Sequence, residues 1–295
     1  MSDMTGQRIG FVGLGSMGGP MAVNLARAGF AVVGYDRRAE AAAPLLAEGG
    51  RAASSAAEAA AGAEALVLMV VNAAQAETVL FADGALEALP AGASVILMAT
   101  CPPGAAAALG ARVEAAGRRF VDAPVSGGVA GAKAGTLTIM AAAPADLFER
   151  NRALLLAMGS RLRHVGETAG QGATVKAINQ LLCGVHLAAA GEALALAKSV
   201  GVDPAVVLDI MSGSAAMSWM LTDRGPRMIR DNPEVTSAVD IFVKDLSIVL
   251  AAGQDAGAAT PLAAAAHRLF VASSEAGHGL EDDSQVVHVF PTLKA

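Results

Sequence analysis

The sequence predicts an α/β domain that is followed by an all-α domain. Two observations carry this prediction. Up to about residue 165, short apolar runs alternate with alanine-rich helical stretches; beyond that point the strand-like runs cease and long segments with helical periodicity replace them. Strands that alternate with helices pair in parallel through right-handed crossovers. A chain of 295 residues is long enough for two domains, which we expect at residues 1–165 and 166–295.

Six short apolar runs are expected to form the strands of one sheet. They are bounded by glycine or polar residues, as strands usually are. The runs are RIGFVG (8–13), FAVVGYD (30–36), ALVLMVV (65–71), ASVILMA (93–99), RFVDAPV (119–125) and GTLTIMAA (135–142). Between the first two, MGGPMAVNLARAG predicts a helix that ends at Gly29, because glycine tolerates the left-handed conformation found after helix ends.

The second half of the chain has the 3.6-residue periodicity of helices. We expect helices over residues 170–200, 204–212, 238–256 and 262–276. No proline- or serine-rich linker separates the two halves. The domains are therefore expected to share the helix that begins near residue 170.

Composition excludes several classes of function. The net charge is −6 and the lysines and arginines are scattered, which argues against binding to nucleic acid or to an anionic membrane. The longest uncharged run, residues 88–111, contains Pro90, Pro102 and Pro103, so we expect no membrane span. No apolar segment precedes the first strand, and no signal peptide is visible.

The cysteines and histidines indicate neither a disulfide framework nor a metal site. Cys101 and Cys183 lack metal-ligand spacing, and two such cysteines are compatible with a reducing cytoplasm. His164, His186 and His267 are far apart in the sequence and have no paired carboxylates, so no metal is expected.

A glycine motif follows the first predicted strand. Gly13, Gly15 and Gly18 have the G-x-G-x-x-G spacing and stand between a strand and a helix. In a Rossmann dinucleotide-binding domain the first glycine allows a tight turn, the second lets a pyrophosphate approach the backbone, and the third permits close packing of helix on strand. The alternative is a glycine turn without a ligand. Its position between strand and helix favours the dinucleotide.

Asp36 follows the second predicted strand, where Rossmann domains carry an acidic residue for the ribose hydroxyls. Its charge would repel a 2′-phosphate, so the sequence favours NAD over NADP. Arg37 and Arg38 leave this open, because a guanidinium there could pair with a 2′-phosphate, lie on the adenine or be solvated.

The segment DAPVSGGVAGAKAGTL (122–137) ends a predicted strand and continues as a glycine-rich loop. Such a loop exposes several backbone N–H groups beside the Ser126 hydroxyl, which together could hold a carboxylate. An irregular connection without a ligand is the alternative.

The only charged side chain between Glu167 and Glu192 is Lys176. On a helix it shares one face with Asn179 and Gln180, at i, i+3 and i+4. A lysine on the helix surface is the ordinary interpretation. A desolvated lysine, however, favours the neutral amine that can accept a proton, and Lys176 is therefore a candidate catalytic group.

Four motifs in this order resemble those of the β-hydroxyacid dehydrogenases, which include 3-hydroxyisobutyrate dehydrogenase and tartronate semialdehyde reductase. They are GFVGLGSMGGPMAVNLARAG, DAPVSGGVAGAKAGTL, GQGATVKAINQ and SAVDIFVKDLSIVLAAG, and they extend over nearly the whole chain. The resemblance implies an N-terminal Rossmann domain, an all-helical C-terminal domain and an active site in the cleft between them. The last motif is most similar to the branch that oxidises L-threonate.

The resemblance also implies roles for individual residues. It makes Lys176 catalytic, and it assigns the substrate to Ser126, Gly127, Gly128 and Asn179. Cofactor contacts are expected in the glycine turn, at the ribose site, in two loops and in the helical half. They are Gly13, Leu14, Gly15, Ser16, Met17, Gly18, Asp36, Arg37, Val71, Asn72, Thr100 and Lys244.

The expected reaction is reversible hydride transfer between a small hydroxy acid and NAD, with Lys176 as acid and base. The acid could be L-threonate or a related sugar acid, 3-hydroxyisobutyrate or 2-hydroxy-3-oxopropionate. An imine reductase and a non-catalytic binding protein on the same fold are the alternatives of other classes. Alanine- and leucine-rich faces in the helical half predict a homodimer or homotetramer.

Overall fold

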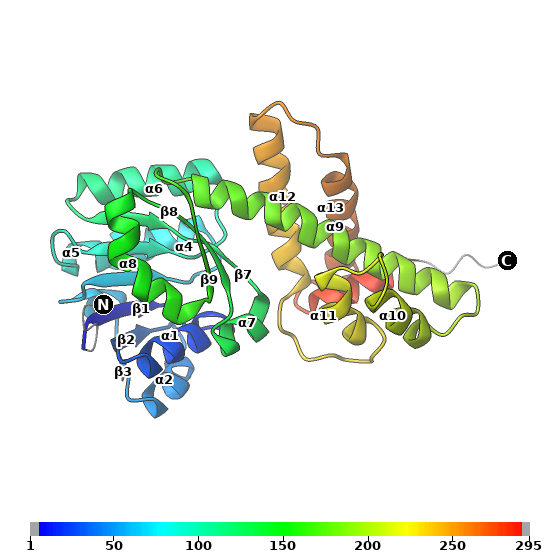
Figure 1. Cartoon of the computed structure of the whole chain (residues 1–295), viewed down its shortest axis with the longest axis horizontal. Helices are drawn as coiled ribbons and strands as arrows, with labels where there is room; N and C mark the ends of the chain where they lie inside the picture. Colours follow the sequence, from blue (N-terminus) through cyan, green and yellow to red (C-terminus); the bar gives the residue numbers. More distant parts are fainter. Residues whose placement is uncertain (1–5, 291–295) are drawn as a thin grey trace. The chain divides into compact units, whose positions relative to one another are not determined.

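The structure is a computed structural model that describes residues 6–290. It divides into two compact units, Met1–Lys176 and Ala177–Ala295. The first unit contains a nine-stranded sheet with helices, and the part of the second unit that is described contains helices and no strand (Figure 1). An α/β domain followed by a helical domain is therefore confirmed. The boundary at 165/166 stays a prediction, and the residues before Gly6, which bear on a signal peptide, lie outside the described residues.

The strands form a sheet in the order β3-β2-β1-β4-β5-β6-β8-β7, with β9 paired to β8. Their bounds are β1 (Arg8–Val12), β2 (Ala31–Tyr35), β3 (Arg51–Ala52), β4 (Ala65–Leu68), β5 (Ser94–Leu97), β6 (Arg119–Asp122), β7 (Val125–Ser126), β8 (Thr138–Ala142) and β9 (Arg161–Gly166). The pairs from β3 to β6 are parallel, and the order β3-β2-β1-β4-β5-β6 is that of the Rossmann fold.

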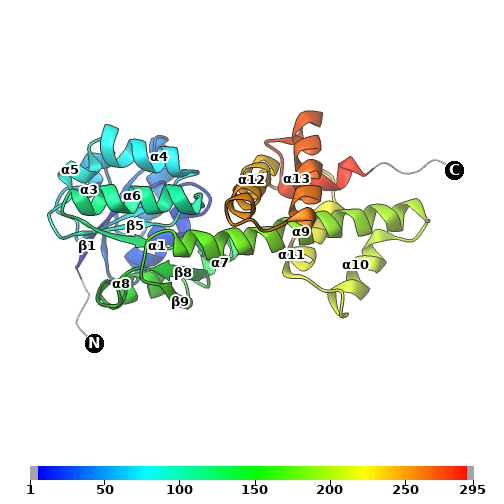
Figure 2. The same cartoon turned by 90° about the horizontal axis from the view of Figure 1, so that it is seen from above.

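Helices cover both faces of this sheet (Figure 2). Their bounds are α1 (Gly18–Arg27), η1 (Ala39–Ala42), α2 (Ala43–Ala47), α3 (Ala56–Ala60), α4 (Ala73–Glu77), η2 (Thr78–Ala82), α5 (Ala85–Ala88), α6 (Pro103–Ala115), α7 (Gly128–Ala134) and α8 (Ala145–Met158). α1, α2, α7 and α8 lie on one face, and α3 to α6 lie on the other.

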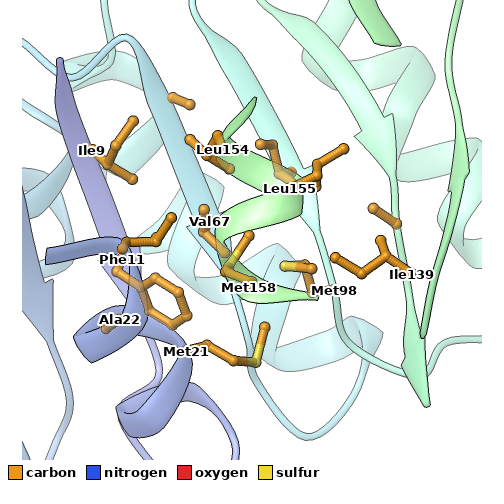
Figure 3. Packing of buried hydrophobic residues seen from close by; sticks show 14 of the residues in the cluster. Ile9, Phe11, Met21, Ala22, Val67, Met98, Ile139, Leu154, Leu155 and Met158 are labelled. Carbon is orange, nitrogen blue, oxygen red and sulfur yellow. The ribbon is translucent and has the colours of Figure 1, made fainter. Parts of the chain in front are cut away.

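Successive residues of a strand point to opposite faces, and each face has its own core. Ile9 and Phe11 of β1 pack with Val67 of β4 in one cluster, whereas Leu66 and Leu68 belong to the other. In the first cluster the strand residues meet side chains from α1 and α8 (Figure 3). The apolar runs of the sequence thus form strands that are buried on both faces, as in a parallel sheet.

Three strands differ from the expectation. The run 119–125 divides into β6 and β7, and β8 pairs antiparallel with both, so the continuous series of parallel pairs ends at β6; β8 and β9 again pair in parallel. β3 and β9 were not expected. β9 has the sequence RLRHVG and is largely exposed at the sheet edge, so it lacks the apolar pattern that marks the buried strands.

The remaining helices begin with α9, which continues from the first unit into the second. They are α9 (Gln171–Ser199), α10 (Pro204–Ser212), α11 (Trp219–Met228), α12 (Val239–Asp255), α13 (Pro261–Ser273), η3 (Ser274–His278) and η4 (Asp283–Val289). The four expected helices match α9, α10, α12 and α13. α11 was missed, because Pro226 interrupts its pattern; Ser218 caps it by accepting a hydrogen bond from the Leu221 N–H.

Within residues 6–290, one helix has the length and composition of a membrane span, contrary to the sequence-based expectation. It is α9, whose most apolar window has a mean hydropathy of 1.4 and is 44% buried in the structure. A core helix of a protein without a membrane span can have the same length and composition, so a single such helix is weak evidence for a span. Residues 88–111, considered in the sequence, instead contain β5 and most of α6.

Candidate active site

The candidate cofactor residues of the first unit lie along one edge of the sheet, whereas Lys244 lies in α12 of the second unit. In parallel strands the carboxyl ends meet at the same edge, where doubly wound folds bind their ligands. Gly13 follows β1, Asp36 follows β2, and Thr100 lies shortly after β5. Val71 and Asn72 follow β4, and Ser126 is reached just after β6. The strand order β2-β1-β4-β5-β6 therefore places them in a row.

The three glycines of the turn have different structural reasons. A Cβ at Gly13, whose φ is +96°, would clash with the Met69 carbonyl, and a Cβ at Gly18 would clash with the carbonyl of Gly13. Around Gly15, the nearest atom to such a Cβ is an Arg38 guanidinium nitrogen at 3.8 Å. Packing thus requires the first and third glycines but not the second. The space in front of Gly15 fits a pyrophosphate that approaches the backbone.

A hollow of about 520 Å³ adjoins this turn. Leu14, Gly15 and Ser16 line it together with residues of α1, and Arg38 and Lys133 provide positive charge at its wall. The Met17 side chain packs against the core, so only its backbone faces the turn. The first unit therefore offers a cavity, a helix N-terminus and cations beside Gly15, which suits an anionic dinucleotide.

Asp36 already has partners within the protein. One carboxylate oxygen accepts from the Leu14 N–H at 2.9 Å, and the other accepts from the Arg38 N–H at 3.0 Å. The Arg38 guanidinium lies 3.3 Å from the same oxygen, and its side chain is 63% exposed. Arg37 is exposed. Asp36 can still accept from a ribose, but Arg38 reduces the negative charge that would repel a 2′-phosphate.

The loop after β4 is shaped by a helix cap. Asn72 Oδ1 accepts from the Gln75 N–H at 2.9 Å and so caps α4, while Gln75 Oε1 accepts from the Val71 N–H at 3.0 Å. Val71 is 49% exposed. An exposed valine before a capped helix is available to lie against a cofactor, and the role of Asn72 established by its contacts is structural.

The segment 122–137, expected to continue as a glycine-rich loop, instead turns at Gly127 after β7 and then forms the helix α7. Two glycines at this turn have positive φ. Gly127 has φ +133° and Gly128 has φ +61°, conformations that L side chains rarely adopt. Ser126 is partly exposed and pairs with Thr138 of β8. The backbone therefore turns sharply directly after the Ser126 hydroxyl, as the predicted carboxylate-binding loop requires.

Asp122, at the end of β6, was not predicted as a functional residue. It is only 1% exposed, and its Oδ2 accepts from the N–H groups of Gly170 and Ala173 at 2.9 Å each. Within residues 6–290 its Oδ1 has no hydrogen-bond partner. Burial raises the pKa of Asp122, and the backbone hydrogen bonds at the start of α9 oppose that rise.

Lys176 lies in the second turn of α9 and is only 6% exposed. The sequence-based expectation of a lysine removed from solvent is met in this respect. Burial alone does not establish a catalytic role for Lys176, and that role stays a prediction.

Further along α9, in the second unit, Asn179 donates to Gln180 Oε1 at 2.9 Å and lies 3.2 Å from Cys183 Sγ. Gln180 in turn donates to Asp245 Oδ2 at 2.5 Å, and the Lys244 ammonium lies 2.6 Å from Asp245 Oδ1. Asp245 is 2% exposed. Asp245 therefore joins α9 to α12 and holds Lys244.

In the segment EDDS (281–284), Asp282 and Asp283 are buried, whereas Glu281 is exposed. Asp283 pairs with Arg224, and Asp282 pairs with Arg227. Asp223 contacts both arginines. Arg224 is only 7% exposed, and Asp223 and Arg224 of the polar segment TDR (222–224) are occupied by these internal contacts.

Other aromatic and histidine residues have structural contacts. Trp219 is 50% exposed, and the Arg224 guanidinium lies 5.7 Å from its ring centre. His164 stacks on Phe148. Among the residues that the structure describes, no cluster of His, Cys, Asp and Glu could hold a metal ion.

Two family models match the chain. Residues 8–166 match the NAD-binding domain of 6-phosphogluconate dehydrogenase, and residues 170–290 match the NAD-binding domain of NADP-dependent 3-hydroxyisobutyrate dehydrogenase. Together they extend over both units.

Relatives and solved structures agree with these models. The chain is 44% identical to an L-threonate dehydrogenase of Cupriavidus necator, over 98% of this chain and 97% of that protein. It is 39% identical to the L-threonate dehydrogenase of Escherichia coli K12, over 96% of this chain and 94% of the relative. A crystal structure of 3-hydroxyisobutyrate dehydrogenase from Salmonella typhimurium matches with a TM-score of 0.92 at 42% identity, covering 96% of this chain and 99% of that one.

The fold and the glycine turn define a nicotinamide-dinucleotide-dependent oxidoreductase. The chain belongs to the 3-hydroxyisobutyrate dehydrogenase-like family of β-hydroxyacid dehydrogenases, which are NAD(P)-dependent and act on CH–OH groups. An imine reductase of Streptomyces aurantiacus also matches, with a TM-score of 0.66 at 23% identity over 95% of this chain and 98% of that one, which shows the fold alone.

Proposed function

We propose that the protein oxidises L-threonate, or a closely related sugar acid, at C2 with NAD. The observation that carries this proposal is the 44% identity to an L-threonate dehydrogenase over nearly the full length of both chains. A 3-hydroxyisobutyrate dehydrogenase of Pseudomonas aeruginosa is 36% identical over 96% of this chain and 98% of that protein. 3-Hydroxyisobutyrate is therefore the substrate to test against.

In the proposed mechanism, Lys176 accepts the proton of the substrate hydroxyl as the carbinol becomes a carbonyl. A nicotinamide cofactor, when bound, would be the acceptor of the hydride from the same carbon. In the reverse direction Lys176 returns the proton to the oxygen. Its burial supports this role, because a desolvated amine is favoured in the neutral form that can accept a proton.

The substrate carboxylate is assigned to Ser126, Gly127 and Gly128. The hydroxyl and the sharp backbone turn after it supply hydrogen-bond donors to an anion. Asn179, held by Gln180, is assigned to the hydroxyl groups of the substrate. These contacts fix the carbinol for proton transfer, which is how positioning groups lower a reaction barrier.

The cofactor is assigned to the carboxyl edge of the sheet and to Lys244, and Asp36 sets its preference. Gly13–Gly18 hold the pyrophosphate, Asp36 the adenosine ribose, and Val71, Asn72, Thr100 and Lys244 are further contacts. NAD is preferred because Asp36 disfavours a 2′-phosphate. Its ion pair with Arg38 makes the preference moderate rather than absolute.

The proposal includes a homodimer or homotetramer in the cytoplasm. In the apolar stretch LSIVLAAGQDAG (246–257), which begins in α12, the large side chains Leu246, Ile248 and Val249 lie in the interior. The end of α9 and α10 instead expose large apolar side chains. These are Leu196, Val200, Val206 and Ile210, between 51% and 65% exposed. A second copy of the chain would bury them, and light scattering should give a mass of a dimer or more.

A panel of C3 to C6 hydroxy acids, with NAD and NADP in parallel and read by absorbance of the reduced cofactor, tests the function. We expect the highest kcat/KM with L-threonate and NAD. A preference for 3-hydroxyisobutyrate would replace the substrate. Turnover of cyclic imines alone would indicate an imine reductase, and turnover of neither class would indicate a binding protein.

A further inference from the structure

The long helix α9 is capped by a side chain that is distant in the sequence. Its first turn donates hydrogen bonds to Asp122, which precedes Gly170 by 48 residues. Helix N-termini leave N–H groups without intrahelical partners, and most helices satisfy them with a residue next to the helix. Here the carboxylate at the end of a sheet strand, β6, accepts the hydrogen bonds.

The start of α9 is closely packed against the neighbouring backbone. Gly170 has φ +97°, and a Cβ there would lie 2.9 Å from the Pro103 carbonyl oxygen. A Cβ at Gly172 would lie 2.5 Å from the backbone carbonyl of Asp122 and 2.7 Å from that of Met140. The start of α9 is thus packed directly against the ends of β6 and β8, and two glycines are needed for it to fit.

Asp122 also has a particular place in the chain. It is followed by Ala123 and Pro124 and then by the loop that begins at Ser126. Lys176 comes three residues after Ala173, one of the two residues whose N–H groups Asp122 accepts at 2.9 Å. A single carboxylate therefore connects the backbone that leads into the proposed substrate loop with the helical turn that leads into Lys176.

We propose that Asp122 is a positioning residue: by capping α9 it holds Lys176 at the correct distance from the substrate bound at Ser126, Gly127 and Gly128. This rests on the proposed function, because it concerns the same reaction. Asp122 itself does not touch the substrate. Only its Oδ2 takes part in the cap, so the geometry depends on one acceptor atom.

Two substitutions distinguish the hydrogen-bond acceptor of Asp122 from its negative charge. Asp122→Asn keeps an oxygen that can accept both N–H groups, and Asp122→Ala removes the acceptor. We expect Asp122→Ala to lower kcat about 100-fold, the scale of a misplacement of about 1 Å, with little change in the Kd for NADH. Asp122→Asn should recover most of that loss. A deuterium isotope effect with C2-deuterated substrate should increase in Asp122→Ala, since the chemical step becomes slower.

Hydrogen exchange measures the cap without any turnover. A peptide that spans residues 168–180 should exchange faster in Asp122→Ala than in the wild type or in Asp122→Asn, because the first turn of α9 loses its acceptor. Ser55→Ala is the matched control. It removes the cap of α3, where Ser55 accepts from the Glu58 N–H at 3.1 Å, and it should lower the melting temperature with kcat unchanged.

The outcomes are distinguishable. Normal kcat in Asp122→Ala despite faster exchange, or unchanged exchange, would overturn the positioning role. A loss of kcat in Ser55→Ala equal to that in Asp122→Ala would also overturn it, because general destabilisation would then explain both. If Asp122→Ala does not fold, Asp122→Ser takes its place, and a kcat equal to that of Asp122→Asn overturns the proposal. A wild type that oxidises no hydroxy acid removes the proposed function itself, and the proposal with it.

Discussion

Asp122 in the first unit and Asp282 in the second are both 1% exposed, yet their pKa values move in opposite directions. Burial raises the pKa of Asp122, and backbone hydrogen bonds from Ala173, Gly170 and Gly172 only partly oppose it. Burial also acts to raise the pKa of Asp282. There, hydrogen bonds from Thr236 and Ser284 and the charge of Arg227 outweigh burial, so the pKa lies below its ordinary value.

The difference shows that burial alone does not tell what a carboxylate does. Asp282 has an arginine partner and hydrogen bonds to both oxygens, as expected for a cross-link between α11 and the segment before η4. Asp122 contacts backbone N–H groups through one oxygen and leaves the other without a hydrogen bond in the described structure. The first arrangement favours stability, and the second favours a fixed geometry.

The largest effect is expected beside Asp122, at Lys176. Lys176→Met keeps an unbranched side chain and removes the proton acceptor, so kcat should fall by about 10²–10⁴-fold. NADH binding, assigned to the glycine turn and Asp36, should change little. Folding should persist, because a desolvated ammonium does not favour the folded state. Stopped-flow turnover at saturating substrate, an NADH titration and a melting curve measure the three quantities.

A Lys176→Met variant that retains most of its kcat would make the lysine structural. Asp122 would then cap a helix that carries no catalytic residue, and the comparison of Asp122 with Asp282 would concern structure alone.

The arginine cluster should show the opposite behaviour. Arg224→Met leaves Asp283, which is 0% exposed, as an unpaired buried carboxylate, and removing one partner of a buried ion pair costs about 3–5 kcal/mol. The activity per folded molecule should remain near that of the wild type. Urea denaturation measures the loss through Trp219 fluorescence. Arg152→Met, followed through Tyr35 fluorescence in the first unit, is the control, since its pair with Glu149 is exposed.

If Arg224→Met lowers kcat at full folding as strongly as Lys176→Met does, the second unit's cluster is not only structural. A contact between the segment TDR (222–224) and the substrate would then be indicated.

Sequence patterns predicted the fold where structure depends on neighbouring residues. The strands β1, β2, β4, β5 and β6 follow from their apolar runs, and the turn at Gly13–Gly18 follows from glycine spacing, since Gly13 and Gly18 are sterically required. β9 and α11 were missed because exposure and Pro226 remove the period from which such elements are recognised.

The site was less accessible from the sequence, because its contacts join distant residues. Asp122 meets α9 across 48 residues, and Arg224 meets Asp283 across 59. Neither pair leaves a local pattern, and an aspartate at a strand end looks the same whether it is solvated or capping a helix. The one available signal for Asp122 was a charged residue inside the apolar run RFVDAPV. The roles of Lys176, Ser126 and the cofactor residues stay predictions.

Asp36 offers a third carboxylate and a smaller effect. Its partners are a backbone N–H and an arginine whose side chain is 63% exposed, so it is less committed than either buried aspartate. Asp36→Ala should lower kcat/KM for NAD about tenfold, the size of one lost hydrogen bond to a charged group, and should leave NADP nearly unaffected. Initial rates with both cofactors measure the ratio. Equal use of NAD and NADP by the wild type would show that Arg38 already dominates.

The smallest expected effect is the pH dependence of stability, which tests the comparison of Asp122 with Asp282 directly. The ordinary pKa of an unfolded aspartate is about 3.9. Because the folded pKa of Asp282 is lower, its contribution to stability is present above that value and is lost as the pH falls through the folded pKa. The folded pKa of Asp122 is raised, so its contribution is present below about 3.9 and is lost as the pH rises through the folded value.

The stability of the wild type minus that of a variant should therefore depend on pH with opposite sign at the two sites. For Asp282→Asn this difference should increase as the pH rises from 3 towards 7, and for Asp122→Asn it should decrease. The single Trp219 reports unfolding of the second unit and the single Tyr35 that of the first, so the two units can be followed separately. Slopes of the same sign would mean that the partners of the two carboxylates do not set their protonation, and the contrast between a cross-link and a positioning cap would fail.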